Sequence, residues 1–322
     1  MVVIQNAVKD LNPRFLANKK GVLKVKKIDM HVHTRMFKGI TRKGADTTYA
    51  SPEELIEMYK PIDVEKGVIL PGGAVECGYQ LQSNEEVMAI VEKYSDSFDW
   101  FCNIHPRMGG NSPDFDLSYF ISYYKDRGAK GLGEVTANFY FDDPFAENLF
   151  HHCQKNDMPL LFHIAPQVGG YYGLVDDLGL PRLEKALAKF PDLIFIGHSQ
   201  PFWAEIGNNT TEENRNNYPT GKIPKEGRLV ELMRKYPNLH ADMSAGSGHN
   251  AVTRDPEFGY DFLEEFQDRL YFGTDICAPE NKTAPFMQLS HWLDEAAESG
   301  KISREAHKKI SRENAENNIG IR

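Results

Sequence analysis

Short apolar runs alternate along this chain with longer stretches in which apolar residues recur at helical spacing. Runs such as 160–164 (LLFHI) and 193–197 (LIFIG) are almost continuously apolar, which is typical of parallel strands covered by helices on both faces. The pattern predicts eight strands, at residues 25–33, 66–70, 98–104, 129–135, 159–164, 193–198, 239–243 and 270–275.

Capping signals and apolar periodicity place helices between these strands. Ser51 precedes Pro52 and Glu54, a sequence that puts an N-cap serine, a first-turn proline and a glutamate at the third helical position. Further helices are predicted at residues 84–93, 117–127, 146–154, 181–190, 228–235, 258–266, 284–298 and 303–317.

Eight strands that alternate with helices over roughly 290 residues fit an α/β fold of the (β/α)₈ TIM-barrel type, which usually needs about 250 residues plus insertions. We expect an N-terminal extension at 1–27, a single barrel domain at 28–322, and C-terminal helices that close the chain. A doubly wound open sheet would need a glycine-rich phosphate loop after the first strand, and residues 34–39 do not form one.

Composition narrows the class of protein. The 322 residues are 41% hydrophobic and 26% charged, as in a soluble enzyme. No run has the length of a membrane span, and the first 20 residues lack a secretory apolar region, so we expect no membrane and a cytoplasmic location. A net charge of −9 argues against nucleic acid as a partner. Four widely spaced cysteines without a C-x-x-C pair predict reduced thiols: Cys77, Cys102, Cys153 and Cys277.

Potential metal ligands gather where the predicted strands end. His31 and His33 are one residue apart, so they share a face of the first strand. Alone, each ligand could be a satisfied core histidine, an ion-pair glutamate or a capping aspartate. Together, six such groups at the carboxyl ends of five strands predict one divalent-metal centre at the rim where barrels carry their chemistry: His31, His33, Glu134, His163, His198 and Asp275. The strand ends at 67–70, 100–104 and 239–244 offer weaker candidates.

Candidate substrate-binding residues come from the loops. Arg107 could clamp a carboxylate or phosphate, or form a surface ion pair. Trp203 lies in the 199–226 insertion, which is long enough for a lid or for a contact between copies in a homo-oligomer. Residues 169–172, with Tyr171 and Tyr172, could supply an aromatic wall, and residues 246–249 a flexible polar contact. The remaining histidines are interpreted as loop residues (His105, His249) or helix-surface residues (His151, His152, His291, His307).

The chain resembles the amidohydrolase superfamily of metal-dependent barrels over most of residues 28–320. The resemblance rests on HVH at the first strand, FHI at the fifth, GHS at the sixth, GTD at the eighth and the closing segment 310–320. It is similar to the amidohydrolase 2 branch, which also contains aromatic-acid decarboxylases. The resemblance implies a metal held by His31, His33 and Asp275 together with His163, with His198 as a second-metal ligand or proton-transfer residue.

The residues of the fourth predicted strand indicate how many metal ions to expect. Lys130 lies four residues before Glu134, about 13 Å lower along a strand, so it cannot act as the carboxylated lysine of many binuclear relatives. Glu134 instead resembles the bridging glutamate of TatD-like nucleases. We therefore expect one or two divalent ions, with zinc as the first choice and manganese, iron or nickel as alternatives.

The predicted function is a metal-dependent hydrolase. A metal-bound hydroxide would attack an amide, lactone, ester or phosphoester bond of a small anionic metabolite, with Asp275 and His198 as catalytic residues and Asp275 moving the proton. The alternative is a mononuclear decarboxylase, a lyase acting on an aromatic or unsaturated carboxylic acid. A TatD-like nuclease shares the ligand set but is disfavoured by the charge.

Overall fold

The computed structural model describes residues 25–42, 46–78 and 80–322. Within them the predicted (β/α)₈ barrel is confirmed: its strands pair in parallel through the order β1-β2-β3 and β4-β5-β7-β8-β9. Bridges from Cys102 to Leu132 and from Val32 to Ile276 join the two sheets into a ring. The barrel strands are β1 (Lys27–Val32), β2 (Val64–Ile69), β3 (Phe98–Trp100), β4 (Leu132–Val135), β5 (Leu160–Ala165), β7 (Phe195–His198), β8 (Leu239–Asp242) and β9 (Leu270–Tyr271).

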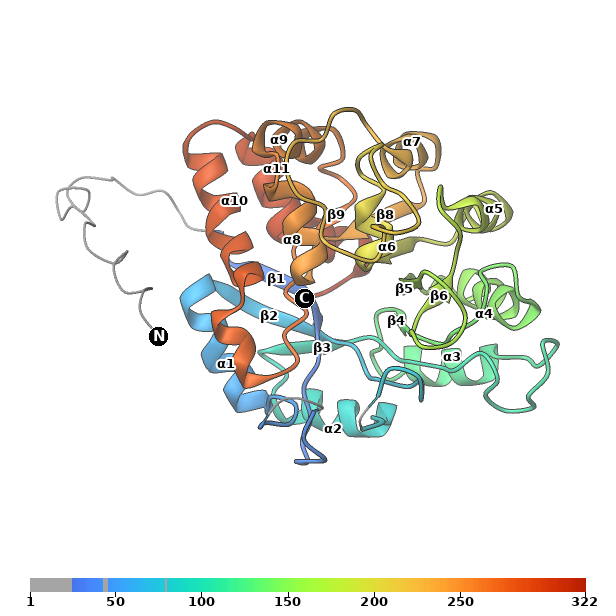
Figure 1. The fold of residues 1–322 in the computed structure, drawn as a ribbon. Helices are drawn as coiled ribbons and strands as arrows, with labels where there is room; N and C mark the ends of the chain where they lie inside the picture. The colour runs from blue at the N-terminus through green and yellow to red at the C-terminus, as the bar shows by residue number, and fades with distance from the viewer. Residues whose placement is uncertain (1–24, 43–45, 79) are drawn as a thin grey trace, which may run out of the picture.

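Helices surround this ring (Figure 1). The first begins as expected, since Ser51 and Glu54 form a reciprocal capping box. The outer helices are α1 (Pro52–Tyr59), α2 (Asn84–Lys93), α3 (Ser118–Lys125), α4 (Pro144–Lys155), α5 (Pro181–Lys189), α7 (Arg228–Lys235), α9 (Pro256–Glu265), α10 (Leu289–Glu298) and α11 (Arg304–Lys308). After α11 the chain continues in π-helical turns, Lys309–Glu313 and Ala315–Ile319.

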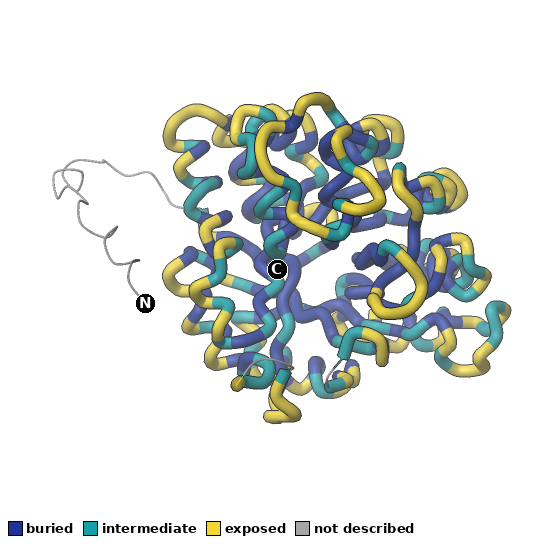
Figure 2. Tube along the Cα trace, in the orientation of Figure 1, coloured by how far each residue is buried: buried dark blue, intermediate teal, exposed yellow. Residues whose placement is uncertain are grey.

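Two apolar cores hold the barrel together. The larger one lies between strands and helices. The smaller one fills the barrel interior and includes Met30, Phe101, Leu161 and Ile196, with Ile321 from the chain end packed into it. In Figure 2 the central strands are buried and the exposed segments are the peripheral loops. The filled interior leaves the strand ends as the place for chemistry.

A β-bulge in β1 determines which way its histidine side chains point. Asp29 pairs with Gly67 and Val32 with Ile69, so β1 advances three residues where β2 advances two. Met30 can therefore pack in the interior core while His31, the next residue, reaches the ligand cluster at the rim. The simple alternation expected from the sequence does not include this extra residue.

Several segments differ from their predictions. Among the elements that were not predicted are β6 (Leu174–Val175), which pairs with β5, and α8 (Ala245–Thr253), which replaces the expected flexible contact at 246–249. The surface interpretation of His152 and His307 was wrong. Both are buried: His152 Nδ1 lies 2.8 Å from Ser118 Oγ, and His307 Nε2 lies 2.8 Å from Asp294 Oδ1.

The 199–226 insertion is anchored to the barrel. It begins with α6 (Gln200–Ala204), and fully buried Arg215 donates from Nη1 and Nη2 to the backbone oxygens of Asp176 and Asp177. A lid or a contact between copies stays a prediction.

The part of the chain that the structure describes has no helix long and apolar enough to cross a membrane. Residues 1–24 of the predicted extension lie outside the described residues, and the expected cytoplasmic location stays a prediction.

Candidate metal centre

The six predicted ligands come together at one end of the barrel. Their ligand atoms form three overlapping groups within 4.8 Å, all among the described residues: His31 with His33 and Glu134; His31 with His198 and Asp275; and Glu134 with His163 and His198. Gly133 permits the close packing of β4 against β5 that this requires, because a Cβ there would lie 2.6 Å from the Leu161 carbonyl oxygen.

Hydrogen bonds fix the tautomers of the first two histidines. His33 Nδ1 lies 2.8 Å from the Leu70 carbonyl oxygen, and His31 Nδ1 lies 2.7 Å from Asp242 Oδ2. A carbonyl or carboxylate oxygen can only accept, so each Nδ1 carries a proton, and each Nε2 is the nitrogen left to bind a metal once any proton on it is displaced. The two Nε2 atoms are 3.1 Å apart. Two lone pairs converge in this way on a cation.

Two carboxylates lie at ligand spacing from the same two nitrogens. Glu134 Oε2 lies 3.6 and 3.5 Å from the Nε2 atoms of His31 and His33, and Asp275 Oδ1 lies 3.6 and 3.4 Å from them. A tetrahedral zinc site with bonds of about 2.0–2.1 Å has ligand–ligand distances of about 3.3–3.4 Å. Histidine nitrogens and carboxylate oxygens at this spacing therefore fit a divalent ion, with His31, His33, Glu134 and Asp275 holding it.

His198 presents its Nε2 by the same logic. The Ser244 hydroxyl donates to Asp242 Oδ2 at 2.6 Å, so Ser244 Oγ accepts from His198 Nδ1 at 3.0 Å. Asp242 Oδ2 itself lies 3.2 Å from His198 Nδ1. One buried carboxylate oxygen thus orients two imidazoles. The sequence offered Asp242 only within the weaker candidate segment 239–244, and the structure gives it this orienting role.

Glu134 and His163 form a close pair. His163 Nδ1 lies 2.7 Å from Glu134 Oε1, a hydrogen-bond distance that is shorter than the edge of a zinc tetrahedron. The Glu134 carboxylate therefore presents Oε2 to the four-ligand site and Oε1 to His163. The His163 ring also packs against Tyr172, with centroids 4.5 Å apart.

The protonation of the ligands reflects competing forces. Burial opposes a charge on His31, but the carboxylates of Asp242 and Asp275 raise its pKa well above the usual value. Burial likewise opposes ionisation of Glu134 and Asp275, but hydrogen bonds from histidines to Glu134 and the charge of His31 beside Asp275 lower the pKa of both. Burial lowers the pKa of His163. Without a metal, protons on the imidazoles balance the carboxylates, so a cation must displace them.

Asp275 is placed by its backbone. It follows β9 with φ 57°, in the left-handed region that aspartate tolerates better than most residues, and its N–H donates to the His31 carbonyl oxygen at 2.8 Å. Its side chain is 28% exposed, against 0%, 13% and 7% for His31, His33 and Glu134. Asp275 is therefore the ligand of the four most accessible to a substrate.

A cavity of about 260 Å³ opens over the ligands. It is lined by four of the predicted ligands, His33, Glu134, His163 and Asp275, and by Tyr172. Its other lining side chains were not predicted to bind a substrate: Arg35, Arg42, Tyr49, Cys77, Thr136 and Cys277. The volume is at the small end for ligand pockets, which suits a small molecule.

The predicted substrate-binding residues lie elsewhere. Arg107 is exposed outside the cavity lining, with its guanidinium 4.8 Å from the Phe139 ring. Trp203 is a core residue, 2% exposed, whose indole donates to the Asp242 carbonyl oxygen. Tyr171 is 41% exposed, while the adjacent Tyr172 lines the cavity. These three positions do not support the predicted contacts, because loop geometry cannot be read from residue type.

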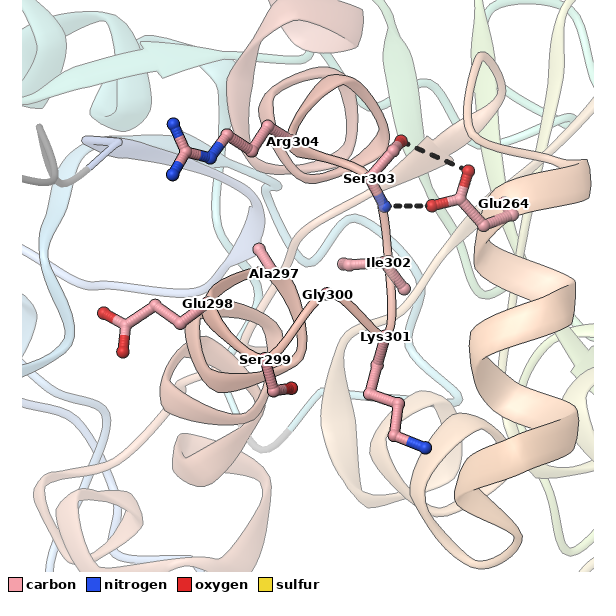
Figure 3. Close-up of a pocket in the computed structure, with 9 residues that line it drawn as sticks. All are labelled: Glu264, Ala297, Glu298, Ser299, Gly300, Lys301, Ile302, Ser303 and Arg304. Atoms are coloured by element: carbon pink, nitrogen blue, oxygen red, sulfur yellow. Dashed lines mark hydrogen bonds between the residues drawn. The ribbon is translucent and has the colours of Figure 1, made fainter.

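A second hollow lies away from the ligands. Figure 3 shows it between the end of α9 and the turn that joins α10 to α11, where Ser303 is hydrogen-bonded to Glu264. Its lining residues include none of the six ligands, so we place the chemistry at the rim.

A parallel barrel with a histidine–carboxylate cluster at its rim defines the class of metal-site TIM barrels. Within that class the chain belongs to the amidohydrolase family, whose sequence model matches residues 28–320. Enzymes of this family are metal-dependent. No curated protein matches the sequence.

Solved structures share the fold at low identity. An uncharacterized TIM-barrel protein from Bordetella bronchiseptica is 17% identical with a TM-score of 0.62, covering 91% of this chain and 97% of its own. An amidohydrolase from Burkholderia multivorans with bound zinc is 12% identical with a TM-score of 0.60, covering 92% and 99%. The 2,6-dihydroxybenzoate decarboxylase from Rhizobium is 17% identical with a TM-score of 0.54, covering 92% and 98%.

Proposed function

We propose that this protein is a metal-dependent hydrolase of a small organic molecule. The observation that carries the proposal is the convergence of Glu134 Oε2 and Asp275 Oδ1, each 3.4–3.6 Å from both His31 Nε2 and His33 Nε2, at the lining of a small cavity. Zinc is the expected ion, because imidazole and carboxylate are its usual ligands and tetrahedral geometry suits it. When bound, such an ion polarises a carbonyl or phosphoryl oxygen and activates water at neutral pH.

The side chains around the metal site have separate roles in the proposed reaction. Asp275, exposed to the cavity, accepts the proton of the attacking water at its carboxylate and returns it to the leaving group. His198, held by Ser244 and Asp242, presents Nε2 beside Asp275 and can share that proton. Asp242 and the Leu70 carbonyl keep the ligand imidazoles in the binding tautomer.

The test measures oxygen transfer and metal dependence together. Zinc-loaded enzyme is incubated in ¹⁸O-water with a panel of carboxylate-bearing lactones, esters and amides. Hydrolysis places one ¹⁸O in the product, is lost on chelation and returns with zinc. Asp275→Asn is expected to lower kcat by about 10²–10⁴-fold, the usual contribution of a general base. Turnover that survives chelation contradicts the proposal.

A second candidate, a decarboxylase with one metal, has its own supporting observation. Glu134 Oε1 is already engaged by His163 at 2.7 Å, so the four-ligand site is complete without a bridge to a second ion. Release of CO₂ from an aromatic carboxylic acid, with one zinc per chain and no ¹⁸O in the product, would favour this reaction over hydrolysis. Two zinc ions per chain would instead favour Glu134 as a bridge.

A further inference from the structure

The cavity lined by the metal ligands is also lined by two guanidinium groups, from Arg35 and Arg42. Arg35 follows the β1 histidines in the chain and is only 3% exposed. Its guanidinium lies 4.1 Å from the Tyr49 ring centroid, and that of Arg42 lies 5.7 Å from the same ring. The Tyr49 ring therefore forms cation–π contacts with both guanidinium groups.

Arg35 has neutral partners. Its Nη1 donates to the Thr34 carbonyl oxygen and to Gln82 Oε1, and its Nη2 donates to the Gln80 carbonyl oxygen. Its buried Nε has no hydrogen-bond partner in the described part of the chain. A buried guanidinium that makes no contact ion pair among the described residues is costly, so Arg35 can accept an anion that enters the cavity.

The guanidinium of Arg42 also lacks a strong hydrogen-bond acceptor. Its Nη1 donates to Cys277 Sγ at 2.6 Å, and a thiol sulfur is only a weak acceptor. Neither Arg42 nor Arg35 forms an ion pair with any described carboxylate of the chain. A carboxylate ligand would be a far better acceptor than a thiol.

Two further residues of the cavity lining lie where a ligand would meet these arginines. Gly72 lines the cavity, and a Cβ there would lie 3.0 Å from Arg35 Nη2, so any other residue would crowd this group. Thr136 Oγ1, also in the lining, is buried without a hydrogen-bond partner among the described residues.

We propose that Arg35 and Arg42 form the subsite that binds a carboxylate group of the substrate, with Tyr49 and Tyr172 flanking its planar body. The inference rests on the proposed function, because it assigns the substrate class of the same cavity: a small carboxylic acid anchored at the arginines, with its reacting bond directed toward Asp275. Planar guanidinium groups bind carboxylates through paired hydrogen bonds.

The experiment compares an anion with its neutral counterpart. Isophthalate and isophthalamide are titrated by calorimetry into wild-type protein, Arg42→Gln and Arg35→Gln, each zinc-loaded and chelator-treated. Loss of charged hydrogen bonds is expected to weaken isophthalate binding by about tenfold to a hundredfold in each variant, with isophthalamide unchanged. Arg42→Lys keeps the positive charge but loses the paired N–H donors of the guanidinium, so it should bind isophthalate more tightly than Arg42→Gln and more weakly than the wild type.

Controls separate the alternatives. Arg127, whose guanidinium stacks 3.5 Å over Tyr123 outside the cavity, supplies the matched variant Arg127→Gln, which should bind isophthalate like wild type. Circular dichroism and zinc content are measured for every variant, and if Arg35→Gln does not fold, Arg42→Gln decides. Isophthalate affinity that is unchanged in Arg42→Gln, or that depends on zinc but on neither arginine, overturns the subsite. Failure of the protein to bind zinc would instead contradict the proposed function.

Discussion

Asp242 links the two halves of the ligand cluster at the scale of single residues. Its Oδ2 accepts from His31 Nδ1 and from Ser244, and lies 3.2 Å from His198 Nδ1. When a ligand imidazole donates its second N–H to a carboxylate, the hydrogen bond fixes the tautomer of the ring and raises its basicity. The sequence placed Asp242 at a strand end without distinguishing it from the ligands, because only the fold shows which atom faces which.

Replacing Asp242 should weaken metal binding. Asp242→Asn removes the charge that orients His31, and we expect the zinc affinity to fall by about 10–100-fold, measured by competition with a chromogenic chelator. Asp176→Asn is the matched control, because Asp176 is equally buried but accepts backbone N–H groups at the start of α5. Equal zinc affinity in Asp242→Asn and wild type would contradict the role given to Asp242.

His240 predicts an acid-sensitive contribution to stability. It is buried beneath the site, where burial and the nearby Arg269 lower its pKa to about 3, and its Nδ1 accepts from the Tyr271 hydroxyl. The unfolded chain binds a proton near pH 6.5 and the folded chain does not, so stability falls as pH drops below 6.5, by up to about 1.4 kcal/mol per pH unit.

Urea unfolding at pH 7.0, 6.0 and 5.0 tests this effect. His240→Gln keeps an acceptor for Tyr271 but cannot titrate, so its free energy of unfolding should fall less steeply with acid than that of the wild type. Parallel slopes for the two proteins would show that His240 is charged or exposed in the folded state.

At the scale of the element, the β1 bulge determines where the histidines point. Asp29 stabilises it: Oδ1 accepts from the backbone N–H groups of His31 and Thr274, and Oδ2 accepts from the hydroxyls of Tyr59 and Thr274. The sequence predicted β1 and the shared face of His31 and His33. It could not predict the bulge, because the stabilising partners come from α1 and from the turn after β9.

Removing the Asp29 carboxylate should destabilise the barrel. Asp29→Ala leaves four buried donors without their acceptor, and an unsatisfied buried donor costs about 1–3 kcal/mol, so we expect a loss of at least about 3 kcal/mol in the free energy of unfolding. Tyr59→Phe removes one of these donors and should cost about 1 kcal/mol. Thermal and urea unfolding measure both variants. Equal losses in the two would show that Asp29 does not hold the bulge.

At the scale of the whole molecule, the eight barrel strands and their outer helices follow from apolar periodicity and capping, because burial on both faces leaves a clear pattern. The ends of the strands also predicted the ligand cluster. The residues that line the cavity could not be predicted together. Arg35, Arg42 and Tyr49 lie in a loop without a regular apolar pattern. They reach Thr136 and Tyr172 only because the strands close into a barrel. The same limit misplaced Arg107 and Trp203.

The central claim is that one divalent ion sits among four ligands from the ends of β1, β4 and β9. Anomalous diffraction at the zinc edge, from crystals of the zinc-loaded protein, tests it directly. The account predicts a peak about 2.0–2.2 Å from His31 Nε2, His33 Nε2, Glu134 Oε2 and Asp275 Oδ1. A peak elsewhere, or no peak at the rim in zinc-saturated crystals, would contradict it.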